Sequence, residues 1–326
     1  FTNEKPYVIY GYAAVDEGQT LTINPGARVH FHANSGLLVT NNASLKINGA
    51  LSSSQELLEN EVIFEGDRLE PLYEDIPGQW GTIWLFNGSF ANEINYATIK
   101  NATVGILVEG NQDAPIDKLI ISNSQIYNSS NFGILGRATS INAENLVLNK
   151  TGQSSFAGTF GGKYNFTHCT IANYWTNSFR QFSALFLNNF IVDEDNNTFT
   201  NDLTEANFNN CIIYGNDNPE ITLDDINGAV FNFKFTNCLI RFQNTNNVPT
   251  GPNYNFANTT LYESIILNED PKFKDPSDNI MTICSGSPAI NQGNPIFAAQ
   301  VPKDITDTSR IGAPDLGAYQ NTNCDD

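Results

Sequence analysis

A six-residue pattern recurs eight times from residue 94 onward. Its first, fourth and sixth positions are apolar or small, and its third position is most often Asn. The copies are 94–99, 121–126, 143–148, 166–171, 187–192, 208–213, 235–240 and 261–266, so successive starts lie 27, 22, 23, 21, 21, 27 and 26 residues apart. A repeat of this length is typical of a solenoid, in which each coil buries its apolar face against its neighbours.

The order of the apolar positions predicts a sharp corner between two strands. Side chains of a strand alternate between its two faces, whereas in this pattern the alternation slips by one residue at the third position. Such a corner needs left-handed backbone, which Asn tolerates better than most other residues. We expect the corner at Asn123, Asn145, Asn189, Asn210 and Asn237. Stacked coils would place these residues about 4.8 Å apart, where their amides can form a ladder.

The residue that follows the corner points back into the core, and in three copies it is Cys. We expect Cys169, Cys211 and Cys238 to be stacked core residues rather than metal ligands, because a free Cys behaves as a small buried hydrophobe. Cys284 and Cys324 both lie in the final segment. In an oxidising compartment they can form a disulfide, and at this stage both the disulfide and two free thiols stay open.

The composition suits a chain of short strands and tight corners, with 46 Asn, 24 Gly and 12 Tyr among 326 residues. A solenoid grows in one dimension, so we expect one continuous domain over 1–326. Residues 1–90 would form the first coils and a cap, 91–270 the regular coils, and 271–326 a C-terminal cap. Asp304, Asp307 and Asp315 surround Arg310 in sequence, and we interpret Arg310 as pairing with one of them in that cap.

The net charge of −19 constrains the partners. Phosphate binding needs clustered Lys and Arg, so we do not expect a nucleic-acid partner, and an anionic membrane surface is disfavoured for the same reason. The apolar runs are too short to cross a bilayer. The chain begins at Phe1 without Met, so we expect that a leader was removed. We expect a monomer.

Two groups of segments resemble known families. Residues 78–83 (GQWGTI), followed by 94–99 and 105–108, resemble a segment of bacterial surface β-helix proteins. Residues 287–293 (SPAINQG), followed by Asp304, Arg310 and 315–319 (DLGAY), are similar to the C-terminal signature of choice-of-anchor Q domain proteins. The chain as a whole resembles the pectate-lyase-like superfamily of right-handed parallel β-helices. The resemblance implies an all-β solenoid that is secreted or held at the cell surface, with a lipid anchor upstream; the periplasm is the alternative location.

No established catalytic arrangement is recognisable. Related polygalacturonases carry an Asp pair together with Gly-His-Gly and Arg-x-Lys, whereas this chain has Asp224 and Asp225 but neither motif. A uronate lyase needs a base and a cation, often Ca²⁺ on an Asp cluster, and no acidic cluster clearly lies beside a basic residue at one-coil spacing. We therefore name no catalytic residue. A lyase or glycoside hydrolase for an acidic polysaccharide, with an unconventional site, stays an alternative.

One acidic segment resembles the beginning of a calcium loop. Asp193, Asp195 and Asn197 have the alternate spacing with which oxygen ligands wrap a hard cation. The sixth position is Thr198 where a calcium loop has Gly. Two interpretations stay open, a Ca²⁺ site at these three residues and a solvated acidic loop without any cofactor.

Aromatic side chains suggest a carbohydrate-binding surface, because aromatic rings can stack on the apolar faces of sugars. The candidates are Tyr174, Trp175, Trp80 and Tyr214, and the Tyr174–Trp175 pair, in an expected loop, is the best platform. The alternative is that these rings cover the core. The leading hypothesis is an exported surface protein that binds a polysaccharide or surface glycan, or adheres to a partner, without catalysis. A purely structural surface protein is the third hypothesis.

Overall fold

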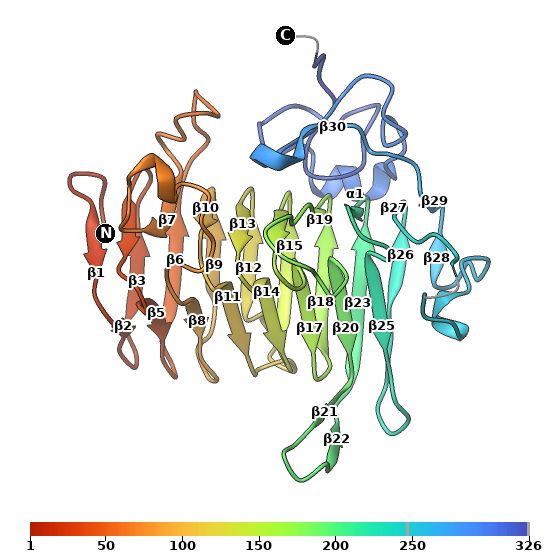
Figure 1. The fold of residues 1–326 in the computed structure, drawn as a ribbon, viewed down its shortest axis with the longest axis horizontal. Helices are drawn as coiled ribbons and strands as arrows, with labels where there is room; N and C mark the ends of the chain where they lie inside the picture. The colour runs from red at the N-terminus through yellow and green to blue at the C-terminus, as the bar shows by residue number, and fades with distance from the viewer. Residues whose placement is uncertain (246–247, 325–326) are drawn as a thin grey trace.

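The computed structural model describes residues 1–245 and 248–324. In it the coils stack along one axis, and three parallel sheets run along that axis (Figure 1). Sheet A contains β1 (Tyr7–Ile9), β4 (Arg28–Phe31), β7 (Val62–Gly66), β10 (Ala97–Lys100), β13 (Gln125–Ser129), β16 (Val147–Thr151), β19 (Thr170–Asn173), β24 (Ile212–Gly215), β27 (Leu239–Ile240) and β29 (Ile266–Leu267). Sheet B contains β2 (Tyr12–Val15), β5 (Gly36–Val39), β8 (Ile83–Leu85), β11 (Val104–Glu109), β14 (Phe132–Arg137), β17 (Phe156–Thr159), β20 (Leu185–Asn188) and β25 (Ile221–Asp224).

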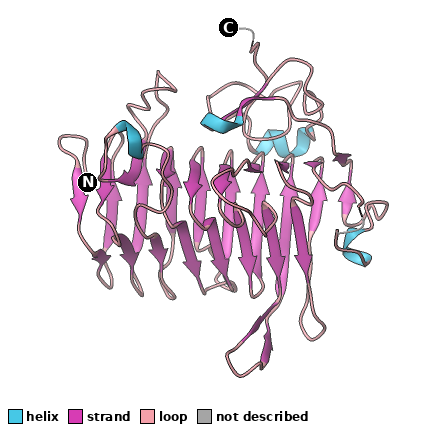
Figure 2. Ribbon diagram, viewed as in Figure 1, coloured by secondary structure: helices cyan, strands magenta, loops and turns pink. Residues whose placement is uncertain are grey.

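The third sheet and the elements outside the sheets complete the molecule (Figure 2). Sheet C contains β3 (Thr20–Ile23), β6 (Ser44–Asn48), β9 (Asn92–Asn95), β12 (Leu119–Ser122), β15 (Ser140–Glu144), β18 (Gly162–Thr167), β23 (Leu203–Asn209), β26 (Lys234–Thr236) and β28 (Tyr262–Glu263). The remaining elements are the hairpins β21 (Phe190–Val192)–β22 (Thr198–Thr200) and β30 (Phe273–Asp275)–β31 (Ile280–Ile283), the 3₁₀ turns η1 (Pro71–Tyr73), η2 (Pro252–Tyr254) and η3 (Pro276–Asp278), and the helix α1 (Pro295–Gln300).

Each strand pairs in parallel with the equivalent strand of the next coil, so like residues form columns in the core. One column runs through sheet A as Ile99, Ile126, Leu148, Ile171 and Ile213. All five side chains are buried. The chain is therefore an all-β parallel β-helix, and this prediction from the repeat is confirmed.

The corner between sheets C and A has the left-handed backbone that its residue pattern requires. Left-handed φ values of 47° to 56° occur there at Tyr96, Asn123, Asn145, His168, Asn210, Asn237 and Ser264. The last of these shows that the final copy begins at Tyr262, which pairs with Phe235, and not at Leu261. Along the corner, Asn145 Nδ2 donates to Asn123 Oδ1 and Asn123 Nδ2 donates to Asn95 Oδ1, each at 2.9 Å.

Asn189 is not part of this corner, so the expectation for the copy 187–192 is corrected. Leu187 pairs with Gly158 in sheet B, and the backbone of Asn189 is not left-handed. The Asn189 amide instead braces a distant loop, because Nδ2 donates to Ile226 O at 3.1 Å and Oδ1 accepts from Ile226 N at 3.0 Å. This coil carries the hairpin β21–β22, which projects from the solenoid (Figure 1).

The three repeat cysteines occupy equivalent core positions. Cys169, Cys211 and Cys238 are free thiols and are fully buried. Each Sγ donates to a carbonyl oxygen of the preceding coil, at 3.5, 3.5 and 3.2 Å respectively. Burial is the first cause that raises the pKa of Cys169 and Cys238, which fits apolar packing.

The C-terminal segment (271–324) covers the side of the solenoid rather than its end, which corrects the expected cap (Figure 1). Its Tyr319 and Ala318 belong to one apolar cluster with Val147 and Ala172 of sheet A. Cys284 and Cys324 form a disulfide within it. The end of the solenoid is closed by aromatic rings that pack against one another and come earlier in the sequence, namely Phe242, Tyr254, Phe256 and Tyr262.

Arg310 belongs to this segment and is buried, and among the described residues it forms no ion pair with a carboxylate, contrary to our expectation. Its Nη2 donates to Ala318 O at 3.1 Å and to Asn145 Oδ1 at 2.9 Å. Asp304 and Asp315 instead accept backbone N–H groups, for example from Gln320 at 2.8 Å and Asn321 at 2.7 Å. Arg310 therefore joins the C-terminal segment to the corner of sheets C and A.

Candidate functional site

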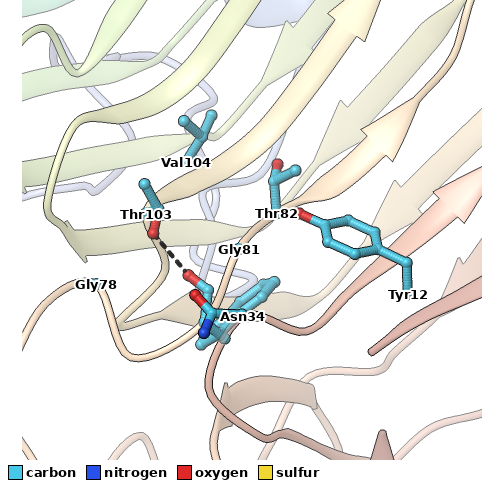
Figure 3. Close-up of a pocket in the computed structure, with 8 residues that line it drawn as sticks. Tyr12, Asn34, Gly78, Gly81, Thr82, Thr103 and Val104 are labelled. Atoms are coloured by element: carbon cyan, nitrogen blue, oxygen red, sulfur yellow. Dashed lines mark hydrogen bonds between the residues drawn. The ribbon is translucent and has the colours of Figure 1, made fainter. Parts of the chain in front are cut away.

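A hollow of about 350 Å³ lies where the first coils turn from sheet A into sheet B (Figure 3). We call it the Tyr12 hollow. Its lining is Tyr12, Asn34, Gly78, Trp80, Gly81, Thr82, Thr103 and Val104. The volume is at the lower end of the range for small-molecule pockets, which begins at about 300 Å³.

Two glycines hold the Tyr12 ring in this hollow. Tyr12 is the first residue of β2 and lies opposite Gly36 of β5. A Cβ atom at Gly36 or at Gly81 would overlap the Tyr12 ring or its hydroxyl. The side chain therefore lies flat across the turn and stays 50% exposed. Burial of its remaining surface raises the pKa of Tyr12, so the phenol is neutral and can donate a hydrogen bond.

Trp80 lines the Tyr12 hollow but does not offer its ring. The ring is 1% exposed and stacks on Phe31 with centroids 4.2 Å apart. Nε1 donates to Lys100 O at 2.9 Å. Thr103 is tied to Trp80, because its Oγ1 donates to Trp80 O at 2.9 Å (Figure 3). Trp80 is therefore a rigid wall, and the predicted stacking of a sugar on its ring is wrong.

The chemistry of the Tyr12 hollow is polar and uncharged. It combines one exposed phenol ring, the amide of Asn34 and the hydroxyls of Thr82 and Thr103. None of the described residues that line it is an acid, Lys, Arg or His. General acid–base catalysis needs a group whose pKa lies near the working pH, and this lining supplies none. The lining can hold a neutral polyhydroxyl ligand by stacking and hydrogen bonds.

A second hollow of about 280 Å³ meets the first at Gly78, which lines both. Its polar side comes from His32, Asp67 and Arg68, and its aromatic side from Tyr73. The Arg68 guanidinium lies over the Tyr73 ring, 4.0 Å from the centroid. His32 Nδ1 lies 2.8 Å from Asp67 Oδ2. The two hollows are neighbours at Gly78, and we call them together the Tyr12–Tyr73 groove.

An apolar row on the outer face of sheet B leads away from the Tyr12 hollow. Leu38, Trp84, Leu107 and Leu135 stand in register on four consecutive strands. The first three are only half-buried. Trp84 Nε1 donates to Glu109 Oε2 at 2.7 Å, which fixes the direction of the indole. A chain-like ligand could extend from the groove along this row.

The other predicted sugar platforms are covered. Trp175 and Tyr214 are each 7% exposed. Trp175 Nε1 donates to Ser178 Oγ at 3.0 Å. Tyr174 packs edge-on against Phe273 of the C-terminal segment, with centroids 6.1 Å apart, and its pKa is raised by burial. The prediction of an exposed platform at these three residues is therefore wrong, and the alternative that the rings cover the core describes them correctly.

The predicted calcium residues lie in the turn between β21 and β22, where they bind one another. Asp193 Oδ1 accepts from Asp195 N at 3.0 Å and from Asn197 N at 2.8 Å. Asp193 Oδ2 accepts from Asn197 Nδ2 at 3.0 Å, which is the first cause that lowers the Asp193 pKa. Across residues 1–245 and 248–324, no group of three or more His, Cys, Asp or Glu side chains is arranged for a metal. Calcium binding here stays a prediction.

The comparisons with known proteins leave the site to stand on its own geometry. No protein-family model and no curated protein matches the chain. Among solved structures, the chain is similar to the crystal structure of pectate lyase Pel9A, with 13% identity and a TM-score of 0.36 over 97% of this chain and 88% of that chain. The three stacked parallel sheets establish the β-helix independently of that likeness. In the described part of the chain, no helix has the length and apolar character needed to span a membrane.

Proposed function

We propose that this protein binds an uncharged glycan in the Tyr12–Tyr73 groove and does not cleave it. The observation that carries the proposal is the lining of the Tyr12 hollow, which joins an exposed aromatic ring to hydroxyl and amide groups without a charged side chain. The apolar face of a sugar ring would stack on Tyr12, while Asn34 and the two threonines would bond its hydroxyls. Adhesion to a glycan-coated surface would follow from this binding.

Electrostatics favours a neutral glycan over an acidic one. The net charge of −19 repels a polyuronate at long range. In the second hollow, Asp67 holds the His32 ring and the Arg68 side chain binds Glu70 at 3.1 Å, so both side chains already have an acidic partner. The alternative of a lyase or hydrolase for an acidic polysaccharide therefore has weaker support, and a purely structural role would leave the arrangement around Tyr12 without a purpose.

We further propose that the chain is exported and is either secreted or held at the cell surface, with the periplasm as the alternative location. We also propose that it is a member of the choice-of-anchor Q group and that a lipid anchor lies upstream. The residues that support the family are 287–293 and 315–319. The Cys284–Cys324 disulfide supports an oxidising compartment, because such bonds are rare where thiols are kept reduced. We propose that it works as a monomer and without a cofactor.

Affinity gel electrophoresis against neutral and acidic polysaccharides tests the proposed function. We expect retardation of the protein by at least one neutral polymer, recovery of that polymer at its original length, and no retardation by polyuronates. Shortened polymer would show cleavage and overturn the non-catalytic assignment. If none of the polymers retards the protein, the structural role is favoured.

A further inference from the structure

A further pocket of about 430 Å³, separate from both hollows, lies on the outer face of sheet A. Its lining includes Gln125 and Tyr127 of β13, Glu56 of the loop before β7, and Asp278, Asn279 and Tyr319 of the C-terminal segment. We call it the Tyr127 pocket. It shares no lining residue with the Tyr12–Tyr73 groove.

The pocket forms where the C-terminal segment begins to cover sheet A. On β16, the next strand of the sheet, Asn149 Nδ2 already donates to Pro276 O at 3.0 Å. On β13 the outward side chains Gln125 and Tyr127 line the pocket, and Gln125 also binds Asn279 of the C-terminal segment. The pocket thus has a floor of sheet residues and a wall of C-terminal residues.

Asn279 supplies an acceptor that has no partner. The side chain is 8% exposed, and its Nδ2 donates to Gln125 Oε1 at 3.1 Å. That bond fixes the amide, and Asn279 Oδ1 has no hydrogen-bond partner among the described residues. Buried polar atoms are almost always hydrogen-bonded. An acceptor of this kind in a pocket lining indicates a ligand that donates N–H or O–H.

The charge of the pocket indicates whether the donor belongs to a neutral or a cationic ligand. Glu56 and Asp278 are its carboxylates, and no Lys, Arg or His is among the described lining residues. The nearby Lys100 ammonium is held by Glu65 at 3.1 Å, and Lys150 donates to Ser277 O at 2.8 Å. The pocket therefore favours a cation.

The two aromatic residues of the pocket are neutral and add to this preference. Burial raises the pKa of both Tyr127 and Tyr319. Nearby charges act on the two phenols in opposite senses, since the Lys100 ammonium lowers the pKa of Tyr127 and the Glu61 carboxylate raises that of Tyr319. Faces of aromatic rings attract ammonium groups.

We propose that the Tyr127 pocket binds a small organic cation with a primary ammonium, of the kind found in an amino sugar that lacks an N-acetyl group. The ammonium donates to Asn279 Oδ1, and Glu56 and Asp278 balance its charge. This site is independent of glycan binding at Tyr12. Loss of the charge by N-acetylation removes both the attraction to the carboxylates and two of the three N–H donors.

Isothermal titration calorimetry with D-glucosamine, N-acetyl-D-glucosamine and D-glucose tests the proposal. We expect D-glucosamine to bind about tenfold or more tightly than the two uncharged sugars, and the double variant E56Q/D278N to lose about tenfold in affinity. Both carboxylates are exposed, so the variant should fold. The matched control E4Q/D16N removes two exposed carboxylates elsewhere and should bind normally.

A second variant addresses the unpartnered acceptor. Asn279 has a left-handed φ of 60°, which Gly adopts readily, so Asn279→Gly removes the acceptor without straining the backbone. We expect weaker binding of D-glucosamine by Asn279→Gly and unchanged binding by Tyr12→Ala. The proposal is overturned if the three sugars bind equally, if none binds, or if E56Q/D278N and Asn279→Gly bind D-glucosamine like the unaltered protein.

Discussion

Arg310 Nη2 donates a hydrogen bond of 2.9 Å to Oδ1 of Asn145, a residue 165 positions earlier in the chain. Asn145 Nδ2 in turn donates to Asn123 Oδ1 and to Lys303 O, each at 2.9 Å. The amide ladder of the corner therefore does two things. It links successive coils, and it anchors the C-terminal segment to the side of the solenoid.

Replacing Arg310 should destabilise the fold measurably. Arg310→Met keeps most of the side-chain volume but leaves Asn145 Oδ1 without a donor and removes one of the two hydrogen bonds to Ala318 O, which keeps the bond from Ile305 N. We expect a loss of about 3 kcal/mol in the free energy of unfolding, measured by denaturant titration. The control Arg137→Met removes an exposed cation that pairs with Glu109 at 3.2 Å and should have a small effect. Equal effects of the two changes would contradict the anchoring role.

His168 should make the protein less stable in mild acid. It occupies the corner position that is Asn in the neighbouring coils, is fully buried, and accepts from Asn210 Nδ2 through Nε2 at 2.9 Å. Burial, with the nearby Arg310 charge, lowers its pKa from 6.5 to about 2. The unfolded chain thus binds a proton at His168 between these pH values and the folded chain does not. The stability from this residue is complete above pH 6.5 and is lost as the pH falls below that value.

The variant His168→Asn isolates this contribution, because Asn fits the corner and does not titrate. Between pH 6 and pH 4 the difference in unfolding free energy between the two chains should change by about 1.4 kcal/mol per pH unit, in favour of the variant. Denaturant titrations at several pH values measure it. A difference that does not depend on pH would show that His168 can bind a proton in the folded state.

The Cys284–Cys324 disulfide should stabilise the C-terminal segment. The bond closes a loop with a sequence separation of 40, and it restricts the unfolded chain more than the folded one. The double variant C284S/C324S should lose about 2–4 kcal/mol. Differential scanning calorimetry with and without a reducing agent checks this, since reduction should lower the Tm of the unaltered protein and leave the variant unchanged. A Tm that is indifferent to reduction would count against the bond.

The three repeat cysteines should be inert while the protein is folded. Cys169, Cys211 and Cys238 are fully buried and unpaired, so no reagent can reach their sulfur atoms. Titration with Ellman's reagent should detect no thiol in native protein and three after unfolding in denaturant without reductant. Rapid reaction of any thiol in the native protein would contradict the stacked-core position.

The sequence predicts the solenoid and most of its corners because both depend on short-range patterns. The apolar pattern around Asn123, Asn145 and Asn210 allows only one backbone conformation that keeps each coil in register with its neighbours, namely a left-handed corner at the Asn. The copy 187–192 has the same pattern but belongs to another sheet, since the hairpin that follows it changes the length of the coil. No local signal distinguishes that copy from the others.

Contacts between distant segments explain the errors at the predicted site. Tyr214 stands on sheet A and Tyr174 directly follows its strand β19, and it is the packing of the C-terminal segment that covers them. A signal was present in the apolar outward residues Val147 and Ala172, which a solvent-facing sheet would not need. Tyr12 was missed because it lies outside the repeats, although its outward position on a strand and the glycines that it contacts mark it.

The most direct test of the account compares Tyr12→Ala with Phe179→Ala in affinity gels that contain the neutral polysaccharide bound by the unaltered protein. Both residues are exposed aromatics, at 50% and 86%, but Phe179 does not line the groove. Loss of a stacking ring should weaken binding by about tenfold or more in Tyr12→Ala, and Phe179→Ala should be retarded like the unaltered protein. Equal retardation of the two variants would contradict glycan binding at the Tyr12 hollow.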